Sequence, residues 1–156
     1  MSTYHAIIRW NRGDDEFLRQ QYSRGHNWHF DGGIAVSASA SPLVVPAPLS
    51  VSAAVDPEEA LVAALSSCHM LFALSRVSKG GFIAESYEDA AEGVLQKRAD
   101  GKTAITHVTL RPVITFKGPA PNAEEYEALH HAAHEECYIA NSVNFPVMVT
   151  PEIRFA

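Results

Sequence analysis

One long apolar helix, expected over residues 56–78, constrains the fold of this chain more than any other segment. Asp56 predicts a helix N-cap, and Pro57 suits the first helical position. Glu59, three residues after the cap, is typical of a capping box, and the glycine at Gly80 is typical of a helix end. Because the middle of the segment is apolar on nearly every face, we expect this helix to be buried on several sides.

The remaining elements are indicated by residue alternation and by turn residues. We expect a strand over 3–10, a hairpin over 24–41 that turns at Asp31-Gly32-Gly33, and an extended proline-rich loop over 42–56. Further on we expect polar strands within 84–99, a turn at Asp100-Gly101, a strand over 105–116, a helix over 123–140 capped by Asn122, and a final strand over 147–155. This order predicts an α+β fold, organised as a single domain of residues 1–156.

Composition excludes some partners. The net charge is −6, and the 12 basic residues are scattered rather than gathered into a stripe, so we expect no nucleic-acid partner.

The N-terminal residues lack the pattern of a secretion signal. The longest apolar stretch, Ala60–Leu74, has 15 residues and includes two serines, a cysteine and a histidine, so we expect no membrane span. These features predict a cytoplasmic protein.

The chain has two cysteines, Cys68 and Cys137, separated by 69 residues. One interpretation is that both are buried thiols that act as small hydrophobic residues. Another is that their helices pack face to face and allow a reversible disulfide. Cys68 lies about three turns into its helix, too far for the helix dipole to activate it, because that effect fades within the first turn. His69 points about 100° away from Cys68 and is not an obvious partner.

Glu58 and Cys68 are ten residues apart on the same expected helix, which separates them by roughly 15 Å along its axis. They therefore cannot touch within one chain. If both serve one site, the carboxylate must come from a second copy of the helix, and the active protein must be a dimer. The alternative is that Glu58 is an ordinary acidic residue of a first helical turn.

Histidines on the second helix suggest a metal site only weakly. His130 and His134 are spaced i and i+4, as zinc ligands often are, but His131 occupies the place where a zinc hydrolase has its glutamate. A solvated histidine-rich helix face is the favoured interpretation, and no catalytic metal is expected. The chain also lacks a glycine-rich phosphate loop and a serine on a strained elbow, so neither a nucleotide cofactor nor a serine hydrolase is expected.

The segment "DPEEALVAALSSCHMLFAL" resembles the signature of the OsmC/Ohr family, the osmotically inducible protein C-like and organic hydroperoxide resistance proteins. In that signature an N/D-P-E-E/Q-x-L segment precedes a cysteine by a fixed spacing, and here Cys68 lies 11 positions after Pro57. A second cysteine near the end of the following helix, here Cys137 in "HEECYIANSV", is the other family mark. The order of elements also agrees along essentially the whole chain.

This resemblance implies an intertwined homodimer with antiparallel sheets around long central helices. It also implies a thiol-dependent peroxidase that reduces organic hydroperoxides as a stress response. Cys68 would be the peroxidatic thiolate and Cys137 the resolving cysteine, with a disulfide between them as an intermediate. An external dithiol would restore both thiols, and no bound cofactor or metal would be needed.

The family also implies a carboxylate that orients an arginine near the thiolate, and Glu58 matches the carboxylate. One branch carries the arginine about ten residues before the glutamate, where this chain has Pro48. The other branch carries it on the N-terminal hairpin, and Arg24 fits that placement. An exposed arginine at the hairpin end is the alternative. The family often has Cys-Pro at the second cysteine, whereas Tyr138 follows Cys137 here.

Apolar residues could form the wall of a substrate pocket that favours alkyl or lipid hydroperoxides, or could be plain core or dimer interface: Leu43, Val44, Val45, Leu49, Met70 and Phe72. The main alternative to a peroxidase is a non-enzymatic relative that binds a small apolar ligand or senses redox state. A zinc protein that uses the histidine helix is a third possibility.

Overall fold

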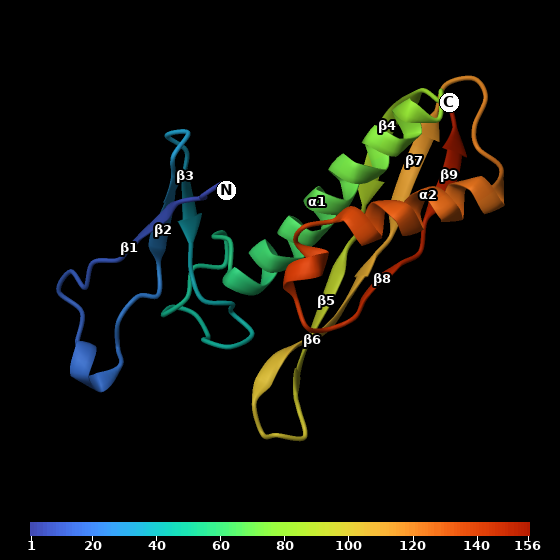
Figure 1. The fold of residues 1–156 in the computed structure, drawn as a ribbon. Coiled ribbons are helices and arrows are strands. Elements are labelled where there is room, and N and C mark those ends of the chain that lie inside the picture. The colour runs from blue at the N-terminus through green and yellow to red at the C-terminus, as the bar shows by residue number, and fades with distance from the viewer. The chain divides into compact units, whose positions relative to one another are not determined.

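The computed structural model describes all 156 residues, which form the two compact units Met1–Ala60 and Leu61–Ala156 (Figure 1). The first unit is built from strands and loops, and the second contains most of helix α1 (Pro57–Lys79), helix α2 (Ala123–Glu136) and six strands. Helices and strands are combined as expected for the α+β class.

The N-terminal unit contains the predicted hairpin. Strands β1 (Ala6–Arg9), β2 (His26–Phe30) and β3 (Ala35–Ala38) form an antiparallel sheet in that order, and a short 3-10 helix, η1 (Phe17–Arg19), lies between β1 and β2. The hairpin turns where predicted, because Gly33 has φ +84° and its N–H donates to Phe30 O at 3.0 Å. Residues 42–56 form turns and loops, as the prolines indicate.

Helix α1 begins at the predicted capping box. The Glu59 N–H donates to Asp56 Oδ1 at 2.8 Å, and the Asp56 N–H donates to Glu59 Oε2 at 3.2 Å. The helix ends at the predicted glycines, since Gly81 takes the left-handed conformation (φ +81°) that allows the Phe82 N–H to reach Val77 O. Both predicted ends of the helix are thus confirmed.

One stripe of α1 is buried, rather than several sides. Leu65, His69, Ala73 and Val77 recur at intervals of four residues and face the strands. On the opposite side Leu71 is 63% exposed, so the expected burial on several sides is not found within one chain.

Helix α1 has 23 residues and is long and apolar enough to span a membrane, judged by length and composition alone. Core helices of soluble proteins meet the same criterion.

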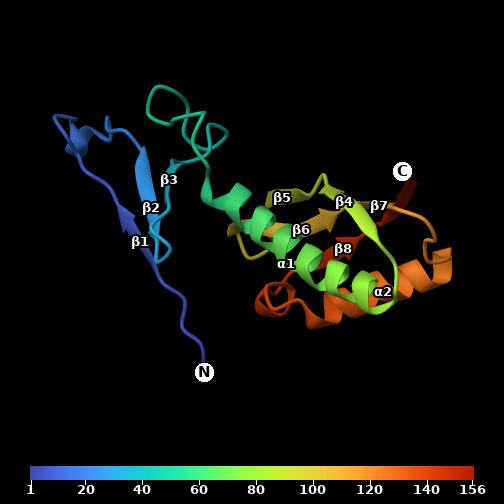
Figure 2. The same ribbon diagram turned by 90° about the horizontal axis from the view of Figure 1, so that it is seen from above.

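The C-terminal unit contains two three-stranded sheets (Figure 2). One has the order β4-β7-β9, with β4 (Ala84–Asp89), β7 (Pro112–Phe116) and β9 (Glu152–Phe155), and the other has the order β5-β6-β8, with β5 (Glu92–Lys97), β6 (Thr103–Leu110) and β8 (Val147–Val149). The β4–β7 and β5–β6 pairs are antiparallel, whereas β9 and β8 add to β7 and β6 in parallel. The predicted turn at Asp100-Gly101 joins β5 to β6.

Two segments that were predicted as single strands each divide between the two sheets. Residues 105–116 contribute to β6 and β7, with Arg111 between them, and residues 147–155 form β8 and β9, with Thr150 and Pro151 between them. Hydrogen bonds join the breaks: the Arg111 N–H donates to Asp89 Oδ1 at 2.6 Å, and the Thr150 N–H donates to Leu110 O at 2.9 Å. Alternation continues across each break, so the pattern alone did not reveal them.

Two hydrophobic clusters lie under α1. Leu65 packs with Val108 and Leu110, while Val77 packs with a second cluster that includes Ile114 and Phe116. Gly93 of β5 permits a close approach to the helix, since a Cβ atom there would lie 2.5 Å from Val62 Cγ2. The buried stripe of α1 therefore bridges the two sheets, and His69 occupies the middle of that stripe.

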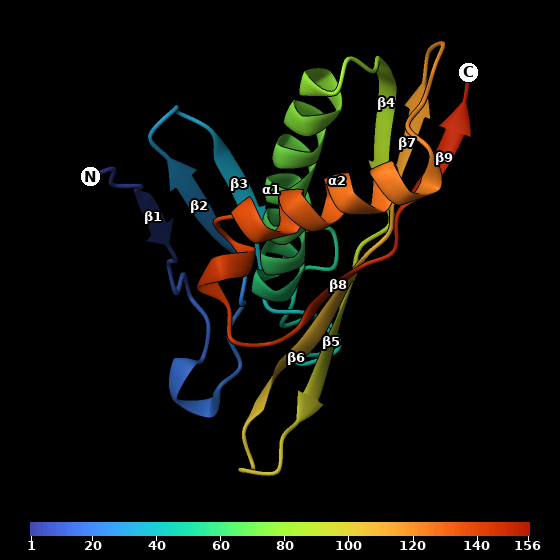
Figure 3. The same cartoon turned by 45° about the vertical axis from the view of Figure 1, so that its right-hand side comes forward.

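Helix α2 (Ala123–Glu136) lies across α1 in Figure 3 and is shorter than predicted. Asn122 and Glu125 form a capping box at its start, which confirms the expected N-cap. The expectation that it runs to residue 140 is wrong, because Cys137 takes an extended conformation and ends the helix. The Asn141 side chain donates to Glu135 O at 2.8 Å, and a 3-10 turn, η2 (Ala140–Ser142), follows.

Asp89 should matter for stability because it joins the break between the sheets to α1. Its carboxylate accepts from the Arg111 N–H and from Ser66 Oγ, the latter at 2.5 Å. Asp89→Ala should lower the free energy of unfolding by about 2–3 kcal/mol in urea denaturation, because two donors lose a charged acceptor. The exposed neighbour Glu88 provides the control, and equal stability of Asp89→Ala and Glu88→Ala would contradict this interpretation.

Candidate functional site

The two cysteines are neighbours, although 69 residues separate them in sequence. Cys68 lies partly buried on α1, and Cys137 lies just beyond the end of α2 with 1% of its surface exposed. Both are free thiols, and the Cys68 side chain lies near enough to Cys137 to affect the ionisation of the Cys137 thiol. Packing of α1 against α2 therefore places the only two thiols of the chain in one location.

Burial controls the ionisation of Cys137. Burial is the main cause that raises the pKa of the Cys137 thiol to about 11, and the nearby Cys68 thiol contributes in the same direction. The Ala140 N–H, which donates to Cys137 Sγ at 3.5 Å, acts in the opposite direction. Cys137 is therefore protonated at neutral pH. Its buried position suits a thiol that reacts with a neighbouring group rather than with solvent.

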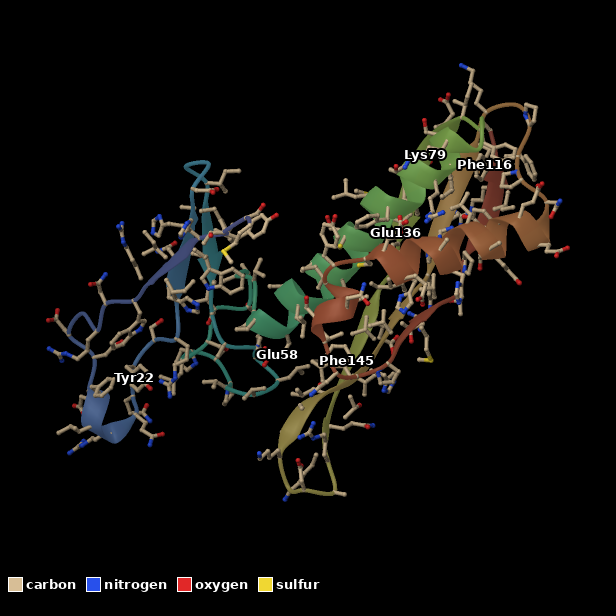
Figure 4. All side chains as sticks on the ribbon, in the orientation of Figure 1. Tyr22, Glu58, Lys79, Phe116, Glu136 and Phe145 are labelled. Atoms are coloured by element: carbon tan, nitrogen blue, oxygen red, sulfur yellow. The ribbon has the colours of Figure 1, made fainter.

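Two side-chain contacts hold the helices together beside the thiols. Phe72, one turn after Cys68, meets Tyr138 edge-to-face with ring centroids 5.1 Å apart. Arg76 Nη2 lies 2.7 Å from Glu136 Oε1 at the C-terminal end of α2, where Figure 4 labels Glu136. Tyr138 thus packs on α1 while 71% of its surface remains exposed.

A buried histidine pair forms a third contact between the helices. His69 Nε2 lies 2.9 Å from His130 Nδ1, and the stacked rings have centroids 5.2 Å apart. Only 1% of His69 and 2% of His130 is exposed. Burial lowers the pKa of His69 to about 4, assisted by His134 and opposed by Asp89, and lowers the pKa of His130 to about 3, assisted by His69. Both rings are therefore neutral at pH 7.

The histidine-rich helix does not have the solvated face that its sequence suggests. His130 is buried and His134 half-buried, whereas His131 is exposed. No group of three or more histidine, cysteine, aspartate or glutamate side chains is arranged to hold a metal ion. His130 and His134 share a helix face as predicted, but His130 uses one ring nitrogen to bind His69 of α1.

Glu58 lies in the first turn of α1, near the end opposite Lys79 (Figure 4). Because α1 is one continuous helix from Pro57 to Lys79, Glu58 and Cys68 are separated by roughly 15 Å along its axis. The geometric premise of the sequence argument is thus satisfied. The role of Glu58 at a site built from two copies of the chain stays a prediction.

Arg24 belongs to the N-terminal unit. Its guanidinium carbon lies 3.6 Å from the centroid of the Tyr22 ring, and Nη1 donates to Gln20 O at 3.2 Å and to Tyr22 O. Its backbone N–H donates to Leu49 O at 2.7 Å. These contacts order Arg24 within residues 1–60, and its placement near the Cys68 thiolate stays a prediction.

Sequence reasoning missed the polar partners of α1. Ser66, one of the two serines in the apolar stretch, donates to Asp89. His69 was considered only as a partner of Cys68, yet its position four residues after Leu65 and four before Ala73 already indicated the buried stripe. The identity of its partner, His130, depends on tertiary packing and carries no local signal.

Comparisons with known proteins agree with this architecture. Residues 50–152 match the sequence profile of the family described as OsmC-like protein. The solved structure of an OsmC-like protein of unknown function from Vibrio cholerae is 54% identical, aligns over 97% of this chain and 99% of its own, and has a TM-score of 0.94. A comparison with functionally curated proteins gives no significant match.

More distant structures share the fold. An organic hydroperoxide resistance protein from Elizabethkingia anophelis is 16% identical, aligns over 100% of this chain and 98% of its own, and has a TM-score of 0.72. The organic hydroperoxide resistance protein OhrB of Bacillus subtilis is 18% identical over 98% of each chain, with a TM-score of 0.61. At these identities the likeness establishes the fold alone.

The histidine pair should make stability depend on pH. Both folded-state pKa values lie below the ordinary value of 6.5, so the unfolded chain binds protons first as the pH falls. Stability that is present above pH 6.5 should therefore decrease towards pH 4, by about 1.4 kcal/mol per pH unit for one such histidine. Urea denaturation at a series of pH values measures this slope.

A double variant, His69→Gln with His130→Asn, keeps hydrogen-bonding groups at the same places but cannot titrate in this range. Its stability should vary less with pH between 6.5 and 4 than that of the unmodified chain. His5→Asn, at an exposed position, should leave the slope unchanged. An unaltered slope in the double variant would show that other groups cause the dependence.

Proposed function

Because the chain belongs to the OsmC-like family, we propose that it is a thiol-dependent peroxidase that reduces organic hydroperoxides to alcohols. Cys68 is the peroxidatic cysteine in this proposal, and Cys137 is the resolving cysteine. The relatives named for organic hydroperoxide resistance share its fold, which supports the reaction class. The catalytic role of each cysteine is a proposal for this chain.

The observation that carries the proposal is the pairing of the two thiols. The chain contains two cysteines, and the α1–α2 contact brings their side chains together. If each cysteine served only as a small buried hydrophobic residue, the fold would not need to bring the two side chains close together. Three further contacts join α1 to α2 or to the residue that follows its C-cap, namely His69–His130, Arg76–Glu136 and Phe72–Tyr138.

The proposed reaction proceeds in three steps. The Cys68 thiolate attacks the distal oxygen of the hydroperoxide, the O–O bond breaks, and the alkoxide takes a proton and leaves as an alcohol. Cys68 is then a sulfenic acid. The Cys137 sulfur, as it loses its proton, attacks the Cys68 sulfur and expels the hydroxyl group as water, which forms a disulfide. An external dithiol reduces that disulfide by exchange and is itself oxidised.

Partial exposure distinguishes the two thiols. Cys68 is partly exposed, so a peroxide can approach it, whereas Cys137 is buried and held protonated by its raised pKa. This asymmetry supports the assignment of attack to Cys68 and resolution to Cys137. In the proposal no metal and no bound organic cofactor is required, and the dithiol is a diffusing partner in the cytoplasm.

We place Glu58 and Arg24 at the same site in an intertwined homodimer. Glu58 is too far from Cys68 on one helix to act within a single chain, so it acts on the Cys68 of a second copy. The exposed apolar side of α1, which includes Leu71, supports burial against that copy.

Sedimentation equilibrium tests the proposed dimer. The measured mass should be twice the chain mass of 17.0 kDa, and the mass of a single chain would contradict the dimer.

Half-buried apolar side chains next to Cys68 support a preference for organic peroxides. Phe72 lies one turn after Cys68 on α1, and the exposed ring of Tyr138 extends this surface, whereas Met70, two residues after Cys68, points to another side of the helix. Such a surface binds an alkyl or aryl group and gives no advantage to hydrogen peroxide. The loop residues Leu43 to Leu49 are proposed as a further part of the wall.

Peroxide consumption in the presence of a dithiol tests the proposed activity. The reduced protein should consume cumene hydroperoxide faster than hydrogen peroxide, and Cys68→Ser should abolish turnover because the nucleophile is lost. Glu58→Gln and Arg24→Met should retain the fold and lower the rate at least tenfold, because thiolate activation is weakened. Glu59→Gln, at the neighbouring exposed position, should have little effect on the rate.

Absence of turnover with several dithiols would contradict the peroxidase proposal and favour a ligand-binding or redox-sensing relative. Equal rates in the wild type and in Cys68→Ser would remove Cys68 from the mechanism. A purified protein with stoichiometric zinc would instead support the zinc alternative.

A further inference from the structure

A separate cleft of about 740 Å³ lies between α2 and the β8–β9 segment. His130 and His134 line it from α2, and Val147, Val149 and Pro151 line it from the opposite side. Neither cysteine contributes to its lining. Its size lies within the range of small-molecule sites in proteins.

Two ring nitrogens at this cleft lack hydrogen-bond partners. They are His130 Nε2 and His134 Nδ1, and both atoms are buried. His130 as a whole is 2% exposed, and its other nitrogen is already bonded to His69. A buried polar atom without a partner is costly, so a ligand that hydrogen-bonds to His130 Nε2 gains affinity by satisfying it.

The charges around the cleft disfavour an anion, and burial disfavours a cation at His130. Glu127 and Glu152 line it and repel an anion. Arg111, its only arginine, already donates to Ala90 O at 3.1 Å and lies 3.4 Å from a carboxylate oxygen of Glu92. A cation at the nitrogen would meet the same desolvation that keeps the His130 ring neutral. The group that binds His130 is therefore neutral.

A hydroxyl group fits these constraints. It can donate to a bare ring nitrogen or accept from a ring N–H, so it suits either tautomer of His130. The side chains of Val147, Val149 and Pro151 provide an apolar surface for a hydrocarbon body. We propose that the cleft binds a small neutral alcohol or phenol whose hydroxyl group bonds to His130 Nε2 and whose hydrocarbon body packs on β8 and Pro151.

Ligand binding in the cleft is coupled to His69 of α1 through the hydrogen bond between His130 and His69. Of the two nitrogens that meet, His130 Nδ1 and His69 Nε2, one must donate and the other accept. A ligand that accepts from His130 Nε2 places the shared proton on His69, and a ligand that donates places it on His130. The role of the ligand at His130 Nε2, donor or acceptor, is therefore linked to the tautomer of both rings, although His69 does not line the cleft.

This site does not depend on the peroxidase proposal, although alcohols released from organic hydroperoxides have the required chemistry. The test uses the full chain with ¹⁵N-labelled histidine and four matched probes: benzyl alcohol, toluene, benzoate and benzylamine. Benzyl alcohol should shift the ring nitrogens of both His130 and His69 with saturation. The other three probes should bind at least tenfold more weakly, because each lacks the hydroxyl group or carries a charge.

Variants separate the hydroxyl contact from the fold. His130→Asn keeps a hydrogen-bonding atom for His69 but removes Nε2, and it should weaken benzyl alcohol binding at least tenfold. His5→Asn, at an exposed position outside the cleft, should bind as the wild type does. If His130→Asn does not fold, His134→Leu, which removes the second unpaired nitrogen, should weaken binding several-fold. Cys68→Ser should bind normally, whatever the outcome of the peroxidase assay.

Three results would overturn the proposal. They are the absence of a saturable shift with benzyl alcohol, binding of toluene, benzoate or benzylamine with similar affinity, and unchanged binding by a folded His130→Asn variant. If benzyl alcohol shifts the ring nitrogens of His130 but not those of His69, binding in the cleft is not coupled to α1.

Discussion

The packing of α1 against α2 is the contact on which the rest of the C-terminal unit depends. The buried stripe of α1 joins two sheets through Leu65 at one end and Val77 at the other. Between them His69 bonds to His130 of α2 inside the protein, at a cost in desolvation that appears as lowered pKa values for both rings. The same contact places Cys68 beside Cys137. Stability and the candidate chemistry thus share one interface.

Much of the fold follows from local sequence signals. The capping boxes at Asp56 and Asn122 and the left-handed glycine at Gly81 are short-range features, and each was predictable from a few residues. The breaks at Arg111 and Pro151 were not predicted, because side-chain alternation continues while the backbone changes sheets. Those breaks are stabilised by Asp89 and by strand neighbours far away in sequence, which a local pattern does not contain.

The candidate site was predictable only in part. The spacing from Pro57 to Cys68 and the position of Cys137 identified the thiols through a family resemblance, and the structure shows them to be neighbours. The pairing of His69 with His130 was missed because it depends on tertiary packing, although the position of His69 between Leu65 and Ala73 indicated its burial. The placement of Glu58 and Arg24 at the site depends on a second copy of the chain, and no pattern within one sequence specifies it.

The most direct test of the central claim is peptide mass mapping after the reduced protein receives one equivalent of cumene hydroperoxide. The account predicts a disulfide between Cys68 and Cys137 in the wild type. In Cys137→Ser it predicts a Cys68 sulfenic acid that a dimedone probe traps. Recovery of both cysteines as unmodified thiols, or oxidation of Cys137 with Cys68 unchanged, would contradict the account.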